Sequence, residues 1–243
     1  MKFTYDAYLN MLKELRDSGY GFIDYHVASK KMGGCILRHD IDMLPSKAER
    51  IGEIENDFGV KSTFFVLLNT SFYNVLFSGT VKQLQRLVSL GHEIGLHFDE
   101  KQYDDCDNAK AFVKHVHAEA NILGDVLGTK ITTVSMHRPS PKTLENNYNF
   151  DGMVNSYSKL FFEDFKYLSD SRMHWRENAE EIIKSQKFKS LQILTHPFWY
   201  EDKEASMHDL LLNFIKDGLQ DRYAGVNANF RDLESVVKKG EIR

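Results

Sequence analysis

Polar residues that could do chemistry stand at the ends of several short apolar runs in this sequence. Asp40 and Asp42 end one run, His97 ends another, and Arg138 and His196 follow two more. Short apolar runs separated by helical patterns are typical of parallel β-strands. Active sites of parallel α/β proteins form at the C-terminal ends of strands. We therefore expect these side chains to share one catalytic mouth.

Asp40 and Asp42 are two residues apart, so on a strand both side chains point to the same side. Such a pair suits one metal ligand beside one general base. A nearby divalent cation keeps both carboxylates ionised, where otherwise they would push each other's pKa apart. Taken alone, the pair is equally well explained as an acidic turn, or as a helix N-cap before Pro45.

The other residues also have two interpretations each. His97 is either a metal ligand or a structural histidine. Arg138 either pairs with a carboxylate such as Asp40 and holds it ionised, or only ties two strands together. His196 is either a general acid or a histidine packed among aromatic residues. Together they indicate metal-assisted hydrolysis of an amide or ester, with Asp40 as base and His196 as acid.

The elements that must position these residues alternate between strand and helix, which indicates one α/β domain over residues 1–243 with a parallel sheet. The first 30 residues read as a helical N-terminal cap. Seven strands are visible, one fewer than in a complete eight-stranded barrel. They are expected at about 35–40, 60–68, 93–97, 131–136, 153–157, 166–168 and 191–195. Helices are expected after Pro45, before Gly91, over 109–127 and near 178–186.

Composition excludes several classes of protein. The 243 residues carry 31 basic and 35 acidic side chains, a net charge of −4, and show no basic stripe that would indicate nucleic-acid binding. Two cysteines make no disulfide framework. No apolar stretch approaches the roughly 20 residues that a membrane helix needs, so no membrane insertion is expected. The N-terminus lacks the apolar core of a signal peptide, and we expect a cytoplasmic protein.

The sequence resembles the polysaccharide deacetylases, the NodB-homology or carbohydrate esterase family 4 proteins, from about residue 34 to residue 200. It is similar in particular to deacetylase-like proteins of lipopolysaccharide and O-antigen gene clusters, which share its Arg-His-Asp-x-Asp and His-Arg-Pro-Ser forms. The order and spacing of the motifs carry the resemblance. The matching segments are Asp40-Ile41-Asp42, Ser62-Thr63-Phe64-Phe65-Val66, Gly91-His92-Glu93-Ile94-Gly95-Leu96-His97, Arg138-Pro139, Asp170 with Trp175, and Leu194-Thr195-His196.

This resemblance implies a distorted seven-stranded (β/α) barrel and a divalent metal, usually zinc. It also implies a role for each site residue. Asp40 would be the catalytic base, Asp42 and His97 metal ligands, Arg138 the support of the base, His196 the acid, and Asp170 the residue that orients the acid.

One position departs from the family pattern. The family usually has a second histidine four residues after the first, and here that position is Lys101, whose amine is protonated near neutrality and is a poor ligand. Three nearby residues could replace it, namely Asp99, Asp104 and His137. We favour His137 as the third metal ligand, because the histidine gained there could compensate for the one lost at Lys101.

The leading hypothesis is a metal-dependent hydrolase that removes an acyl group, most simply acetyl, from an amino sugar during cell-surface polysaccharide biosynthesis. The substrate would be a saccharide, either a nucleotide sugar or a lipid-linked intermediate. The alternative is a non-catalytic saccharide-binding protein of the same fold, which Lys101 motivates. A deacetylase-like enzyme acting on a small cyclic amide ranks last, because fold alone does not fix substrate. Aromatic residues near the mouth either stack on sugar rings or pack the rim: Phe98, Tyr103, Phe198, Trp199 and Tyr200.

Overall fold

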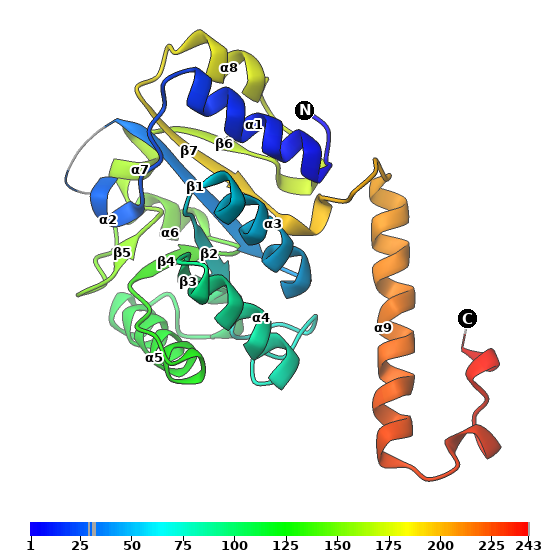
Figure 1. Ribbon diagram of the computed structural model, residues 1–243. Helices are drawn as coiled ribbons and strands as arrows, with labels where there is room; N and C mark the ends of the chain where they lie inside the picture. Colours follow the sequence, from blue (N-terminus) through cyan, green and yellow to red (C-terminus); the bar gives the residue numbers. More distant parts are fainter. Residues whose placement is uncertain (29, 31–32, 243) are drawn as a thin grey trace. The chain divides into compact units, whose positions relative to one another are not determined.

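The computed structural model describes residues 1–28, 30 and 33–242, and most of the chain forms an α/β fold around one sheet (Figure 1). All seven strands pair in parallel, in the spatial order β5-β4-β3-β2-β1-β7-β6. They are β1 (Gly34–Ile41), β2 (Thr63–Val66), β3 (Glu93–Phe98), β4 (Thr133–Met136), β5 (Val154–Asn155), β6 (Lys166–Ser169) and β7 (Ser190–Thr195). Among the described residues no pairing joins β5 to β6, so the sheet curls without closing. The predicted distorted seven-stranded (β/α) barrel is confirmed.

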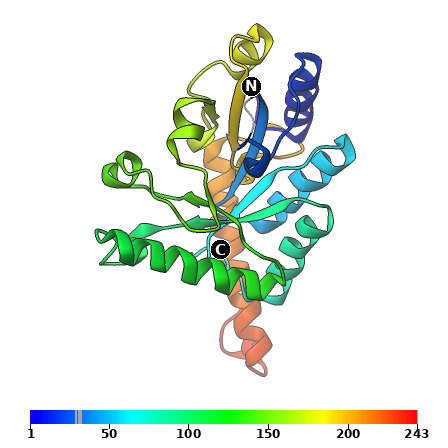
Figure 2. The same ribbon diagram turned by 90° about the vertical axis from the view of Figure 1, so that its left-hand side faces the viewer.

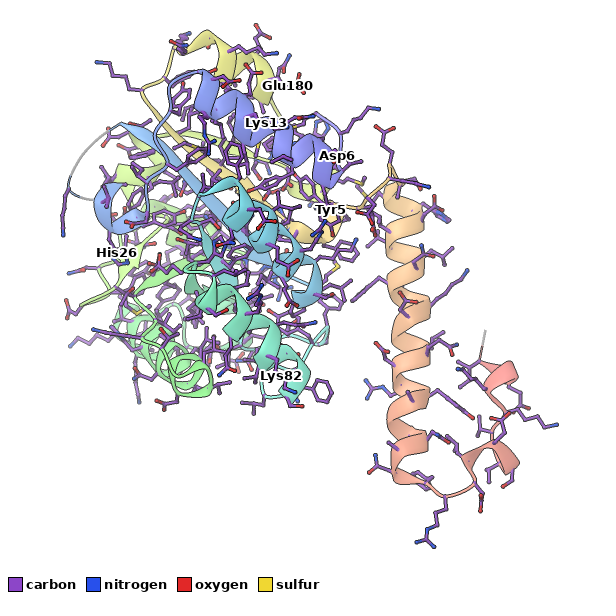
Figure 3. All side chains as sticks on the ribbon, viewed as in Figure 1. Tyr5, Asp6, Lys13, His26, Lys82 and Glu180 are labelled. Carbon is purple, nitrogen blue, oxygen red and sulfur yellow. The ribbon has the colours of Figure 1, made fainter. Side chains whose placement is uncertain are left out.

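The helices form an outer layer. Helices α8 (Ala179–Ser185), α1 (Tyr5–Asp17), α3 (Pro45–Phe58), α4 (Ser78–Ser89) and α5 (Ala109–Leu127) are successive neighbours in that order and lie outside the curled sheet (Figure 2). The expected N-terminal cap is thus part of this layer, since α1 packs beside α3 and α8. Polar residues of this layer project to solvent, among them Asp6 and Lys13 on α1 and Glu180 on α8 (Figure 3).

Local sequence explains where the main helices begin and end. The Oγ1 atom of Thr4 caps α1 by accepting the backbone N–H of Ala7 at 3.1 Å. Pro45 occupies the first turn of α3, where a missing N–H costs nothing. Gly59 then ends α3 in the left-handed conformation, at φ 84°, which glycine adopts without a steric penalty. Shorter helices complete the connections: α2 (Tyr25–Ala28), α6 (Pro141–Glu145) and α7 (Lys159–Glu163).

The interior of the sheet is filled by large side chains that require a small neighbour. A Cβ atom on Gly95 of β3 would lie 2.6 Å from the ring of Phe65 on β2, which is too close for any real contact. Glycine at this position therefore lets the Phe65 ring occupy the space inside the curled sheet. Phe65 belongs to an apolar cluster with Tyr25, Ile36 and Phe161. This cluster supports β1 and β2 beneath the ends of the strands.

A buried carboxylate joins the sheet to the helices on the opposite side. Glu55 of α3 is fully buried and accepts the hydroxyl hydrogen of Tyr8 from α1 at 2.6 Å. Its Oε1 atom also lies 3.0 Å from Nε2 of His39 on β1, and Nδ1 of His39 lies 2.7 Å from Oγ1 of Thr195 on β7. Burial alone would raise the pKa of Glu55, but His39, with smaller contributions from His92, brings that pKa below its usual value.

The C-terminal residues form a second compact unit. The chain divides into Met1–Asp202 and Lys203–Arg243, and the second unit consists of α9 (Met207–Asn229) followed by two short 3₁₀ turns. Within it, the hydroxyl of Tyr223 donates to Oε2 of Glu234 at 2.6 Å. The sequence predicted one unit over 1–243, and it lacks the Pro/Gly/Ser-rich linker that would have marked a boundary. No described helix, α9 included, has both the length and the apolar character needed to cross a bilayer.

Replacing Glu55 by glutamine should lower the free energy of unfolding by about 3 kcal/mol, because it removes one partner of a buried charged network. Urea unfolding followed by circular dichroism measures this. Glu53→Gln on the same helix is the matched control, since its partly exposed ion pair contributes under about 1 kcal/mol. Equal losses of unfolding free energy in the two variants would show that the buried Glu55 network stabilises the protein no more than the exposed Glu53 ion pair does.

The same network should make the protein sensitive to acid. The pKa of Glu55 is lower in the folded state than its unfolded value of about 4.3. Ionised Glu55 therefore contributes stability above that pH, and this contribution is lost as the pH falls through the folded pKa. Between about pH 6 and pH 3, thermal unfolding should show a steeper loss for the wild type than for Glu55→Gln. Parallel curves would contradict this expectation.

Candidate active site

Five polar side chains meet at the C-terminal edge of the sheet. Asp40 lies on β1 with Asp42 just beyond it, His97 lies on β3, and His137 and His196 directly follow β4 and β7. Because every strand runs in the same direction, these ends share one edge. The structure thus brings together residues that are as far apart in the chain as 40 and 196.

Three of these residues direct ligand atoms toward one another. Nε2 of His97 lies 3.1 Å from Nδ1 of His137, and these two nitrogens lie 3.4 and 3.3 Å from Oδ1 of Asp42. Ligands held at about 2.0–2.1 Å by a tetrahedral zinc ion stand about 3.3–3.4 Å apart, so the triangle fits such an ion. Among the described residues, Asp42, His97 and His137 are the one set of three that meets the geometry of a metal site.

The protonation state of Asp42 also suits a ligand. Its Oδ1 atom is buried and has no well-oriented hydrogen-bond donor among the described residues, although both imidazoles are close. Burial alone would raise the pKa of Asp42, but the nearby imidazoles of His137 and His97 and the charge of His196 hold that pKa far below its usual range. Asp42 is therefore an anion at neutral pH, as a metal ligand must be.

Asp40 is held by an arginine that the sequence analysis did not single out. Nε and Nη2 of Arg38 donate to Oδ1 and Oδ2 of Asp40 at 2.9 and 2.8 Å, and Nη2 also donates to Oγ of Ser135. Both charged side chains are buried. Burial opposes ionisation, but Arg38, followed by His97, brings the pKa of Asp40 below its usual value. The spacing of Arg38 and Asp40, two residues apart on one strand, could have revealed this pair, because both must point to the same side.

Arg138 does not support Asp40 as predicted. It donates instead to Asp99, with Nε 3.3 Å from Oδ1 and a second, shorter bond from Nη2 to Oδ2. Strand order gives the reason: Arg138 follows β4 and Asp99 follows the adjacent β3, whereas β1, which carries Asp40, lies three strands from β4. The pairing also occupies Asp99, one of the possible third ligands. Another, Asp104, lies exposed in the connection that follows β3.

His196 is oriented by Asp170, in the arrangement that the family resemblance implied. Nδ1 of His196 lies 2.6 Å from Oδ1 of the fully buried Asp170, which also accepts the backbone N–H of His196 and, at 3.1 Å, the hydroxyl of Tyr200. Nε2 of His196 therefore faces the site, 3.9 Å from Oδ2 of Asp42. Burial would lower the pKa of His196, but the hydrogen bond to Asp170 and the charges of Asp170, Asp42 and Asp40 together outweigh it and raise the pKa to about 9. His196 is thus protonated at neutral pH and can donate a proton.

Most of the aromatic residues near the mouth pack the interior. Phe98, Phe198, Trp199 and Tyr200 are buried, and Tyr200 also supports Asp170. Tyr103 stacks on Phe98 with ring centroids 5.6 Å apart. Of the two interpretations, packing of the rim is the one that these contacts favour.

Comparison with known proteins gives only distant similarity. No protein-family model matches the sequence, and no curated protein sequence matches it. Similar solved structures include the Xyl-CE4 domain of a multidomain xylanase from the hindgut metagenome of Trinervitermes trinervoides (18% identity, 79% of this chain and 85% of that chain, TM-score 0.43). Others are the Streptococcus pyogenes deacetylase PplD in complex with acetate (16%, 78% and 80%, 0.45) and a CE4 family pseudoenzyme from Bacillus anthracis (13%, 79% and 63%, 0.44). At these identities and TM-scores the similarity is too low to assign a function.

Arg38 and Arg138 should differ sharply in their contribution to stability. Arg38→Met leaves Asp40 buried without its counter-ion and should lower the free energy of unfolding by about 3 kcal/mol. Arg138→Met removes a guanidinium whose side chain is 48% exposed, and Asp99 keeps the backbone N–H of Lys101 and the amide of Gln102 as donors, so the loss should be about 1 kcal/mol or less. Urea denaturation of both variants measures the difference. A larger loss in Arg138→Met would mean that the Arg38–Asp40 pair is not formed.

Proposed function

We propose that this protein is a metal-dependent hydrolase that removes an acyl group, most simply acetyl, from the amide nitrogen of an amino sugar. The observation that supports this most directly is the triangle of Asp42, His97 and His137, with an ionised carboxylate and a protonated histidine beside it. A base and an acid beside a metal site are the groups that amide hydrolysis needs.

Each residue has a task that follows from its surroundings. Asp42, His97 and His137 would hold the metal, with zinc favoured by two imidazoles and one carboxylate. When bound, the metal would polarise the amide carbonyl and make the attacking water more acidic. Asp40, kept anionic by Arg38, would accept the proton of that water. His196, kept protonated by Asp170, would donate a proton to the leaving amine.

The division of labour between the two aspartates rests on their partners. Asp42 faces two imidazole nitrogens, whereas Asp40 is engaged on both oxygens by Arg38 and lies 3.4 Å from Nε2 of His97 through Oδ2. A carboxylate already bound by an arginine is a weaker metal ligand than one facing only imidazoles. Asp42 is therefore the better ligand, and Asp40, which Arg38 keeps ionised and away from the metal, is left to act as the base. We place the reaction in the biosynthesis of a cell-surface polysaccharide, in the cytoplasm, with a saccharide or nucleotide sugar as substrate.

Metal binding tests the ligand set directly. After incubation with zinc and dialysis, elemental mass spectrometry should find about one ion per chain in the wild type and much less in His97→Ala and in His137→Ala. His115→Ala is the matched control, because this histidine of α5 pairs with Asp105 in the preceding connection, and its loss should leave the metal content unchanged. Metal retained in His137→Ala would assign the third ligand elsewhere. No metal in the wild type would favour the non-catalytic saccharide-binding alternative.

Activity tests the roles of base and acid. Release of acetate from N-acetylated amino sugars should fall by about 100-fold or more in Asp40→Asn and in His196→Gln, since general acid–base groups contribute that much. Both variants should keep most of their metal. Undiminished turnover in Asp40→Asn would remove Asp40 as the base, and acetate release without any metal would overturn the proposed mechanism.

A further inference from the structure

An exposed apolar surface lies on the connection between β2 and α4, at the same edge of the sheet as the candidate active site. Phe72, Leu76 and Phe77 are 50%, 66% and 64% exposed. We call these three side chains the apolar rim. Three large apolar side chains exposed within a stretch of six residues are unusual on a protein surface unless that surface binds something.

The connection that carries the apolar rim is fixed in place beside the active site. The hydroxyl of Tyr73 donates to the backbone carbonyl of Ile41 at 2.8 Å and accepts the backbone N–H of Leu67 at 3.0 Å. Ile41 directly precedes the proposed ligand Asp42. Val75 is buried, so the same segment turns one apolar side chain inward while the rim points outward. The exposure of the rim is thus a property of an anchored segment with its own interior packing.

Hydrogen bonds hold the rest of the segment as well. The backbone N–H groups of Phe72 and Leu76 donate to the side chains of Thr70 and Asn74 at 3.2 and 2.9 Å. A Cβ atom on Gly79 would lie 3.0 Å from the ring of Phe77, so glycine there leaves room for the ring against the start of α4. These contacts fix the direction in which the rim faces.

Charge indicates what kind of partner the rim can take. No residue from 62 to 81 is charged. The neighbouring connection after β3 exposes the acidic residues Asp104, Asp105 and Asp107, and both connections bind the same carboxylate, since Asn69 and Tyr103 donate to Oε1 of Glu119. An acidic neighbour disfavours docking on an anionic bilayer surface. A flexible, uncharged hydrocarbon chain needs only an apolar strip and fits these constraints.

We propose that the substrate carries a hydrocarbon chain, and that the apolar rim binds the part of this chain nearest to the sugar. This inference rests on the proposed function, because it assumes that the sugar occupies the edge formed by Asp42, His97 and His137. A lipid-linked saccharide is the chemical class of substrate that combines a sugar with such a chain. Burial of its first methylene groups against the rim adds affinity without any hydrogen bond.

The test compares two probes that differ only in their chain, methyl and octyl 2-acetamido-2-deoxy-β-D-glucopyranoside, the latter below its micelle concentration. Dissociation constants are measured by calorimetry with the zinc-incubated full-length protein. The octyl glycoside should bind the wild type at least about tenfold more tightly, because burial of a few methylene groups is enough for that ratio. Calorimetry needs no turnover, so the comparison does not depend on catalysis.

The variant Phe72→Ser/Leu76→Ser/Phe77→Ser should reduce this ratio to about one to two and leave the affinity for the methyl glycoside unchanged. The matched control is Ile122→Ser/Ile215→Ser/Val236→Ser, which removes three apolar side chains exposed elsewhere and should keep the wild-type ratio. Thermal unfolding verifies that both variants are folded.

Several outcomes would overturn the inference. They are a ratio near one in the wild type, an unchanged ratio in the rim variant, failure of both glycosides to bind, and rim-dependent binding to plain phosphatidylcholine vesicles with no preference for the octyl glycoside. Failure of the proposed function looks different. In that case neither glycoside releases acetate, while the octyl preference and its dependence on the rim persist.

Discussion

The alternation of side chains along β1 is the constraint on which both polar centres of this protein depend. Successive residues of a strand point to opposite faces. Arg38 and Asp40 therefore face the interior of the curled sheet, while His39 between them faces the helices and meets Glu55. A shift of β1 by one residue would exchange the two environments and place a charged pair against α3. The buried Glu55 network and the candidate active site are in this sense two sides of one strand.

Electrostatics inside the site is arranged by giving each charge a different partner. Asp40 has a guanidinium, Asp42 has two imidazoles, and His196 has the buried carboxylate of Asp170. Two carboxylates this close would otherwise raise each other's pKa. Because every partner comes from a different position on the sheet, the two aspartates remain ionised together and differ in what they can do. This difference is the physical basis for treating one as a base and the other as a ligand.

The connections that surround the site are tied to it by single side chains. Tyr73 fastens the connection after β2 to the carbonyl of Ile41, and Arg138 joins the connection after β4 to Asp99. Glu119 of α5 accepts hydrogen bonds from both Asn69 and Tyr103, and so links the connection after β2 to the connection after β3. Surface segments that carry function are commonly held in this way by a rigid scaffold. The apolar rim therefore has a fixed position relative to Asp42, as a substrate-binding surface requires.

The sequence alone determined the features that depend on local periodicity. Apolar runs and helical spacing predicted the seven strands and the main helices, and polar residues at strand ends predicted that Asp40, Asp42, His97 and His196 would meet. Tertiary structure decided which partner each residue has. The order β4-β3-β2-β1 places Arg138 beside Asp99 and away from Asp40, so the arginine that supports Asp40 comes from β1 itself. The same order brings His137 to His97. Such pairings depend on distances across the sheet, which spacing along the chain does not encode.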